Sequence, residues 1–175
     1  GPMVVVSNHC SNADSFLISG LPWEMKWLGK SGLFNIPIVG WSMRLSGDIP
    51  IVRGERDSIK RAVERCRTYL SRGVPVIIFP EGTRSETDEM LPFREGAFRL
   101  AIDEGVPIMP IAVEGTRTAL AKHDWRFDYS RARVIVGEPI PTADLKEEDM
   151  EQLMEETRRQ IEALRHTLRT KLTEP

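Results

Sequence analysis

The stretch IPIVRGERDSIKRAVERCRTYLSRGVPVIIF, residues 49–79, decides the fold class of this chain. It begins and ends with short β-branched runs, at 49–52 and 74–79, which are typical of buried strands. Between them, apolar residues recur at helical spacing over residues 57–71, and Gly73 provides a stop signal. A strand, a helix and a second strand in succession indicate a protein of the α/β class.

The same alternation extends to both sides of this stretch. Further buried strands are predicted at residues 4–6, 25–28, 108–113 and 133–136. A shorter helix around Ala97 ends before Gly105, and a long helical pattern over 146–172 carries one apolar stripe. We therefore expect a single-domain α/β sandwich, with a mostly parallel or mixed central sheet flanked by helices and a long C-terminal helix. We interpret that long helix as a packing helix, with a partner-binding or coiled-coil role as the alternative.

Composition narrows the function classes. The formal net charge of -2 over 175 residues leaves no electrostatic footprint of a nucleic-acid partner. Cys10 and Cys66 match no metal or redox spacing, which favours a reducing, cytoplasmic setting. No apolar run reaches the roughly eighteen residues that a membrane span requires. Gly1-Pro2 is typical of the scar left by a tag-removing protease, so we expect the natural amino terminus to have been cut away.

The segment NHCSNAD, residues 8–14, follows the first predicted strand and brings a histidine and an aspartate into one loop. A neutral imidazole, here His9, can take a proton from a hydroxyl nucleophile, and a carboxylate, here Asp14, can fix the tautomer and orientation of the ring. This pair could therefore make an alcohol nucleophilic. His123 and Asp128 have the same spacing, but they belong to an irregular aromatic stretch, and we interpret His123 as structural or at the surface.

Two more segments place possible phosphate ligands after predicted strands. FPEGTRS, residues 79–85, contains Gly82, which lets the backbone approach a ligand, and Arg84, whose guanidinium can grip a phosphate. GDIPIVR delivers Arg53 to the end of a strand, and Lys30 is a further possible phosphate contact. The alternative for each is a turn or a solvated charge.

A fourth segment, VPIMPIAV at residues 106–113, contains two prolines, which disfavour a regular central strand. We therefore expect an edge strand or an irregular wall at this point. Plain core is the alternative.

Taken in order, the four segments resemble the lysophospholipid acyltransferase family, which includes the 1-acylglycerol-3-phosphate acyltransferases. NHxxxxD is similar to the first motif of that family, GDIPIVR to the second, FPEGTRS to the third and VPIMPIAV to the fourth. The resemblance covers residues 4–140. One departure is Pro50, which stands where the second motif usually carries an aromatic residue and so affects the expected strand geometry.

The resemblance implies a role for each matched residue. His9 is the expected general base, and Asp14 is its orienting partner. The expected acceptor site consists of Glu81, Gly82, Thr83 and Arg84, with Arg53 and Lys30 at the acceptor phosphate. Pro110 is expected to shape the wall of the acyl-donor region. No metal or organic cofactor is expected, because an acyl-coenzyme A or acyl carrier protein thioester serves as co-substrate.

The resemblance also implies a reaction. The expected acyltransferase domain comprises residues 3–175, including a helical extension at 142–175. It would move a fatty acyl group from the thioester to the hydroxyl of a 1-acylglycerol-3-phosphate-like lysophospholipid and form phosphatidate. Three alternatives remain: glycerol-3-phosphate or another lysolipid as acceptor, a thioesterase that uses the His–Asp pair to activate water, and a non-catalytic domain that binds lipid.

Membrane contact is expected as well. Residues 21–46 combine three tryptophans with Lys26, Lys30 and Arg44, which suits a membrane interface, although burial in the core would explain the same apolar residues. Family members commonly carry membrane-associated segments before the first motif, so we expect such a segment to be missing here. The natural protein is expected at the cytoplasmic face of a membrane, and the present chain is expected to be soluble.

Overall fold

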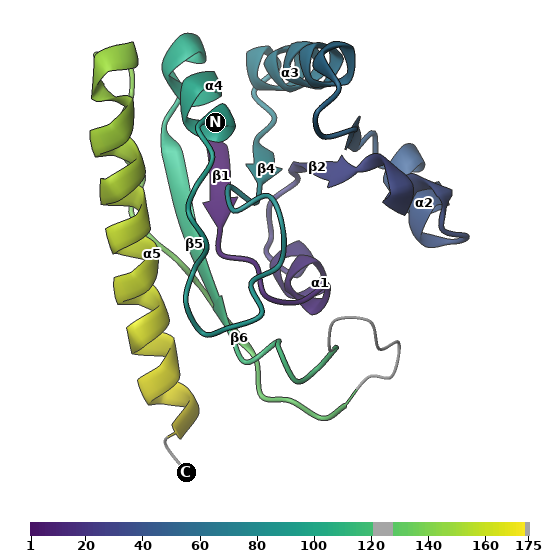
Figure 1. Cartoon of the computed structure of the whole chain (residues 1–175), viewed down its shortest axis with the longest axis vertical. Coiled ribbons are helices and arrows are strands. Elements are labelled where there is room, and N and C mark those ends of the chain that lie inside the picture. The colour runs from purple at the N-terminus through teal and green to yellow at the C-terminus, as the bar shows by residue number, and fades with distance from the viewer. Residues whose placement is uncertain (121–127, 174–175) are drawn as a thin grey trace.

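The computed structural model describes residues 1–120 and 128–173, and its centre is a six-stranded sheet in the order β3-β2-β4-β1-β5-β6 (Figure 1). The strands are β1 (Val4–Ser7), β2 (Lys26–Lys30), β3 (Ile49–Ile51), β4 (Val76–Ile78), β5 (Ile108–Glu114) and β6 (Arg133–Val136). The first five are parallel, and β6 is antiparallel to β5. The predicted α/β class with a mostly parallel sheet is confirmed.

Helices cover both faces of this sheet. They are α1 (Ala13–Ser19), α2 (Val39–Leu45), α3 (Arg56–Ser71), α4 (Gly96–Glu104) and α5 (Met150–Thr173), with short 3₁₀ helices η1 (Ser31–Asn35) and η2 (Glu147–Asp149). Val4 and Val6 of β1 share one core cluster with residues of α3, α4 and α5. Val5 points to the opposite face, as strand alternation requires, and shares a second cluster with Ile18 of α1. The three longer helices therefore form one layer, and α1 covers the other face.

Helix α5 belongs to the main core. It runs along the outer side of β5 in Figure 1, and its buried residues Leu153, Ile161 and Leu168 join the cluster that contains Val4. Before the helix, the buried Thr142 hydroxyl donates hydrogen bonds to two carbonyl groups at the end of α4 and in the turn after it, at 3.0 and 2.7 Å. The prediction of a packing helix is confirmed.

Strand β5 lies between β1 and β6, so the predicted edge position of residues 106–113 is wrong. Pro110 is tolerated inside the sheet for a local reason. Its carbonyl accepts a hydrogen bond from the N–H of Gly137 at 2.8 Å, and Gly137 lies just beyond the end of β6. The N–H and C=O of one strand residue face the same side, so the N–H that proline lacks would also face this region. Because β6 has already ended there, no ladder hydrogen bond is lost. Residues 108–113 are buried throughout, as the alternative of plain core implies. The strands at the two edges are β3, which carries Pro50, and β6.

Residues 31–45, called the arm below, protrude beside β2 as η1 and α2 (Figure 1). Neither element was predicted, because five to seven residues are too few to establish a helical period. Ile38 has φ 67° and is the central residue of a γ-turn closed by a 2.8 Å backbone bond between its neighbours. A Cβ atom at Gly40 would lie 2.1 Å from the carbonyl oxygen of Phe34, so α2 packs backbone to backbone on η1.

None of the helices in the described parts of the chain combines the length and apolar character needed to cross a bilayer.

Candidate active site

The predicted site residues lie at one edge of the sheet. His9 follows β1, Lys30 ends β2, Arg53 follows β3, and residues 81–84 follow β4, all on parallel strands. The carboxyl ends of parallel strands meet at the same edge, so the topology brings these residues together. Strand order sets their spacing. Strand β4 adjoins β1, whereas the ends of β2 and β3 are two and three strands away, or about 10 and 14 Å at the usual strand separation.

His9 and Asp14 form the predicted pair. The Nδ1 atom of His9 lies 2.9 Å from Oδ2 of Asp14, whose side chain is fully buried in the first turn of α1. The imidazole ring stacks on Phe79, with the ring centroids 3.9 Å apart. Because a carboxylate accepts, Nδ1 carries the proton and Nε2 is the acceptor nitrogen. Within the described residues, no group hydrogen-bonds Nε2, so it is available to a substrate.

The Asp14 carboxylate is held from several sides. Its Oδ2 also accepts the backbone N–H groups of Cys10 and Ser11, at 2.8 and 2.9 Å. Its Oδ1 accepts the hydroxyl of the buried Thr116, which follows β5. The carboxylate can therefore change neither its position nor its orientation without losing hydrogen bonds, and the imidazole that it holds is fixed as well.

Glu81 joins the two principal loops. Its Oε1 accepts the backbone N–H of His9 and its Oε2 that of Leu91, both at 2.7 Å. The carbonyl of His9 accepts the N–H of Ser85 at 2.8 Å. Burial raises the pKa of Glu81, and the two N–H bonds act against that rise. The Glu81 carboxylate thus binds the backbone of both loops, and its expected acceptor-site role stays a prediction.

The remaining predicted ligands are cationic or small. Thr83, Arg53 and Lys30 are exposed, and Arg84 is half-buried. No hydrogen bond or ion pair occupies the side chains of Lys30, Arg53 or Arg84 within residues 1–120 and 128–173. These cations are thus open to an anion.

Arg94 is a site residue that the sequence did not single out. Its backbone N–H donates to the carbonyl of Pro80 at 2.8 Å, and its side chain crosses over Gly82. A Cβ atom at Gly82 would lie 2.7 Å from Nε of Arg94, and Gly82 has φ 73°. Glycine is therefore required for two reasons, the close approach of the Arg94 side chain and the positive φ. Partial burial, and then the charge of Arg94, lower the pKa of Arg53. The positive charge of Arg94 therefore acts on Arg53.

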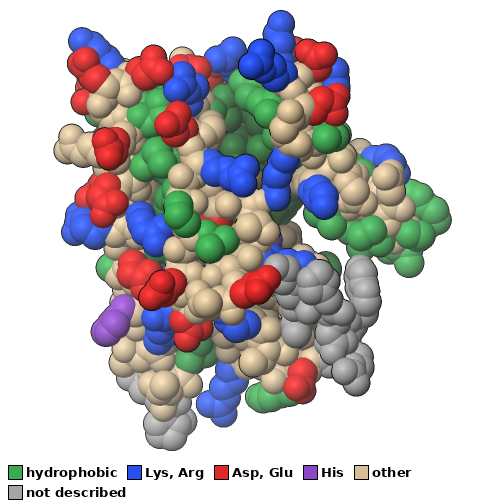
Figure 2. Space-filling view, viewed as in Figure 1, with side chains coloured by type: hydrophobic (Ala, Val, Ile, Leu, Met, Phe, Trp, Pro, Cys, Tyr) green, Lys and Arg blue, Asp and Glu red, His purple; other side chains and the backbone are tan. Residues whose placement is uncertain are grey.

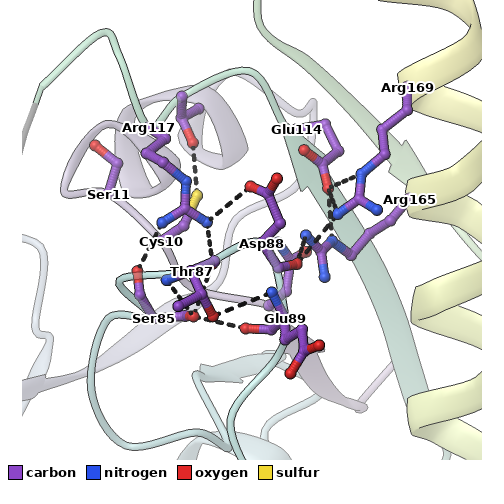
Figure 3. A network of polar contacts seen from close by, with 12 residues as sticks. Cys10, Ser11, Ser85, Thr87, Asp88, Glu89, Glu114, Arg117, Arg165 and Arg169 are labelled. Atoms are coloured by element: carbon purple, nitrogen blue, oxygen red, sulfur yellow. Dashed lines mark hydrogen bonds and ion pairs between the residues drawn. The ribbon is translucent and has the colours of Figure 1, made fainter.

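The tetrapeptide Glu-Gly-Thr-Arg occurs twice, at 81–84 and at 114–117, and each copy comes at or just after the end of a buried strand. The second copy supplies Thr116 and also Arg117, which donates to the carbonyl of Ser85 at 3.1 Å and to that of Thr87. Figure 3 shows Arg117 directed at Thr87 and Asp88. This recurrence is the sequence signal that could have identified both residues.

Cys10 is close to the pair without being suited to nucleophilic attack. Its Sγ lies 3.2 Å from the Thr116 hydroxyl, and burial, followed by the charge of Asp14, raises the pKa of the thiol to about 11. The thiol is therefore protonated near neutral pH.

The interpretations of Pro110 and His123 stay predictions. Pro110 is buried within β5, and its ring lies beside Gly137 on the α5 side of the sheet, so its donor-site role stays a prediction. His123 lies outside the described residues. Among those that are described, no three His, Cys, Asp or Glu side chains come together as a group that could hold a metal ion.

The family described as Acyltransferase matches residues 1–114 of this chain. The chain belongs to the acyltransferase family. The resemblance drawn from the four motifs is confirmed, and the chain places its first and third motifs in direct contact through Glu81 and Ser85.

Individual relatives carry more specific names. The acyltransferase is 36% identical over 140 residues to 1-acyl-sn-glycerol-3-phosphate acyltransferase BAT2, chloroplastic, of Brassica napus, covering 79% of this chain and 41% of that protein. It is 36% identical over 159 residues to 1-acyl-sn-glycerol-3-phosphate acyltransferase alpha of Homo sapiens, covering 90% and 56%. The crystal structure of the 1-acyl-sn-glycerophosphate (LPA) acyltransferase PlsC from Thermotoga maritima matches with a TM-score of 0.76 at 31% identity, covering 93% and 66%. The chain thus spans 41% to 66% of the length of these relatives.

Proposed function

We propose that the chain transfers an acyl group from a thioester, of coenzyme A or of acyl carrier protein, to the free hydroxyl of a 1-acylglycerol-3-phosphate-like lysophospholipid and so forms phosphatidate. The observation that carries the proposal is the His9–Asp14 pair at the carboxyl edge of a parallel sheet, with Nε2 open to a substrate. The names of the relatives support the choice of reaction.

In the proposed step, Nε2 of His9 removes the hydroxyl proton while the hydroxyl oxygen forms a bond to the thioester carbonyl carbon. The tetrahedral adduct then collapses, the carbon–sulfur bond breaks, and the thiolate takes the proton from the imidazolium. General-base help of this kind contributes on the order of 10²- to 10⁴-fold. The carboxylate of Asp14 stabilises the imidazolium that forms, because the two lie 2.9 Å apart.

A cationic group near the pair would hold the acceptor phosphate. Arg84, Arg53 and Lys30 were predicted for this role, and Arg94 lies close enough to lower the pKa of Arg53. Guanidinium and ammonium groups bind a phosphate through charge-assisted hydrogen bonds. Water as acceptor would need no such group, so these cations favour transfer over simple hydrolysis.

One face of the molecule is hollowed between two helices. Figure 2 shows a recess with hydrophobic walls, bordered on one side by Lys and Arg side chains, in the region between α3 and α4 of Figure 1. An acyl chain in such a recess would place a charged headgroup at its rim. This arrangement supports a substrate that has both an acyl chain and a phosphate.

The arm is the proposed membrane contact, at the cytoplasmic face of a bilayer. Figure 2 shows hydrophobic side chains gathered over α2, where Ile38, Trp41 and Leu45 are 74%, 61% and 90% exposed. Lys30 and Arg44 add exposed cations next to them. By contrast, Phe34 is 5% exposed, so the stretch divides between core and surface. Apolar side chains flanked by cations suit the interface of an anionic bilayer.

Thiol release from a long-chain acyl-coenzyme A, and in parallel from an acyl carrier protein thioester, tests the proposal. The wild-type chain and His9→Ala are compared with and without lysophosphatidate. Release that requires both His9 and the acceptor supports acyl transfer. Release that requires His9 alone would replace the proposal with a thioesterase, and acceptor binding without any release would replace it with a lipid-binding domain.

A further inference from the structure

Helix α5 is outside residues 1–114, where the family matches, yet it contacts the loop that holds His9. Arg158 donates from its two terminal nitrogens to the carbonyls of Leu91 and Met90, at 2.8 and 2.7 Å. Its guanidinium also lies 5.3 Å from the centre of the Phe93 ring. One side chain of α5 therefore holds residues 90–93 of the connection between β4 and α4.

Two further arginines of α5 bind the outer part of the same connection. Arg165 is 3% exposed and donates to the carbonyl of Asp88 at 2.7 Å and to Oε1 of Glu114 at 2.6 Å. Arg169 reaches the same two groups, each at 3.2 Å. Figure 3 shows both arginines extending from α5 toward Asp88 and Glu114. Arg158, Arg165 and Arg169 are seven and four residues apart, a spacing that places them along one side of the helix.

These bonds continue to the backbone of His9. The carbonyl of Leu91 is held by Arg158, while the N–H of the same residue donates to Oε2 of Glu81. The other oxygen of Glu81 accepts the N–H of His9. Three consecutive hydrogen bonds, each of 2.7 or 2.8 Å, therefore connect α5 to the backbone of His9.

Burying guanidinium groups is costly unless each is hydrogen-bonded, and an apolar stripe alone would have sufficed to cover the sheet. The charged groups of α5 are instead directed at carbonyls of residues 88–91, which no regular secondary structure occupies. We propose that α5 is a positioning element for the catalytic loop, in which Arg158 acts through Leu91 and Glu81 to hold His9 in place. This inference rests on the proposed acyl transfer only where turnover is the readout.

Arg158→Ala and Arg159→Ala form a matched pair for the test. The two residues are adjacent in α5 and lose the same side chain, but the Arg159 side chain is 72% exposed and pairs only with Glu156 within the described residues. Arg158→Ala is expected to lower kcat at least tenfold, with the acceptor KM changed less than twofold, and Arg158→Lys is expected to recover part of the loss. Arg159→Ala is expected to match the wild type.

A double-mutant cycle separates positioning from general stability. In a Glu81→Gln background the connection to His9 is already broken, so Arg158→Ala is expected to lower kcat less than twofold there. A tenfold loss in both backgrounds would overturn the proposal, because it would show that Arg158 acts independently of Glu81.

Hydrogen exchange gives a readout that needs no turnover. The backbone amides of His9 and Leu91 are expected to exchange at least tenfold faster in Arg158→Ala than in Arg159→Ala, with equal unfolding transitions. Unchanged exchange would overturn the proposal even in an active enzyme. Faster exchange in a protein that shows no acyl transfer would support the positioning role and contradict the proposed function alone.

Discussion

The carboxyl edge of the sheet, which holds His9, and the arm, residues 31–45, differ in what they bury and what they expose. At the edge, Asp14 and Glu81 are 0% and 3% exposed, and all four of their carboxylate oxygens accept hydrogen bonds from the protein. On the arm, Leu45 is 90% exposed, and Ile38 adopts a positive φ that β-branched residues rarely take. Buried polar groups with every bond satisfied fix one geometry, whereas exposed apolar groups are suited to a partner that is not part of the chain.

The two regions also differ in how firmly the rest of the chain holds them. The His9 loop receives bonds from segments after β4 and β5, and the connection that holds it is bonded to α5. The arm is held to the rest of the chain mainly through β2, β3 and the packing of Phe34. Changes at the edge should therefore alter the rate of chemistry, and changes on the arm should alter attachment to a surface.

The largest effect is expected for Asp14→Asn. The amide has one acceptor oxygen where the carboxylate has two, and being neutral it would no longer stabilise an imidazolium, so kcat should fall by about 10²-fold or more. The free energy of unfolding should fall by about 1–3 kcal/mol, because buried donors lose their acceptor. Turnover and chemical denaturation measure the two effects. Retained turnover would mean that the pair at the edge is not the reacting one.

Arg84→Ala should weaken binding of the acceptor and leave general-base catalysis by His9 nearly unchanged. Loss of a charge-assisted bond worth about 1.5–3 kcal/mol predicts a rise in acceptor KM of about tenfold to a hundredfold, with kcat nearly retained. Acceptor saturation curves with lysophosphatidate provide the measurement. Arg72→Ala, at an exposed residue beyond the end of α3, is the control. An unchanged acceptor curve in Arg84→Ala would remove this arginine from the phosphate site.

The arm is tested by the double substitution Trp41→Ser and Leu45→Ser. Each side chain contributes up to about 1.5–3 kcal/mol when fully transferred out of water, so even partial immersion predicts at least tenfold weaker binding to anionic vesicles. Sedimentation with vesicles measures this, and turnover on an acceptor dispersed in detergent should stay within about twofold. Equal vesicle binding by the variant would show that another surface meets the membrane.

The smallest effect is expected for Cys10→Ser, which keeps a hydrogen-bonding group beside Thr116. The thiol pKa of about 11 keeps Cys10 protonated at neutral pH, so turnover should change by less than about threefold. Because the folded pKa is raised above the usual thiol value of 9.0, the thiol contribution to stability is present below pH 9 and is lost toward pH 11. Alkylation followed by mass spectrometry should accordingly be slow at pH 7 and accelerate over that range.

Much of this arrangement could be predicted from the sequence, and the reasons for the remainder are physical. The strands and the longer helices have periods that a sequence displays, and His9 and Asp14 are close in the chain. The helices of the arm were missed because they are short, and the turn at Ile38 takes a conformation that no residue preference would suggest. Pro110 was misplaced because its tolerance depends on where β6 stops, which a strand's own sequence does not contain.

The same distinction applies to the site. A loop motif indicates which residue types are present, whereas the partners of Glu81 are backbone groups ten and seventy-two residues away. Backbone groups leave no mark on the sequence, so the hydrogen bonds by which Glu81 joins the two loops could emerge only from the fold. The repeated Glu-Gly-Thr-Arg at 114–117 was the one visible sign of the second supporting segment.

The central claim is that His9 activates the acceptor hydroxyl. The most direct test is the formation of phosphatidate, measured by mass spectrometry, from lysophosphatidate and an acyl thioester in anionic vesicles. The wild-type chain should form the product, and His9→Ala, with an unchanged unfolding transition, should form it at least about a hundredfold more slowly. Equal rates of phosphatidate formation in the two proteins would contradict the account.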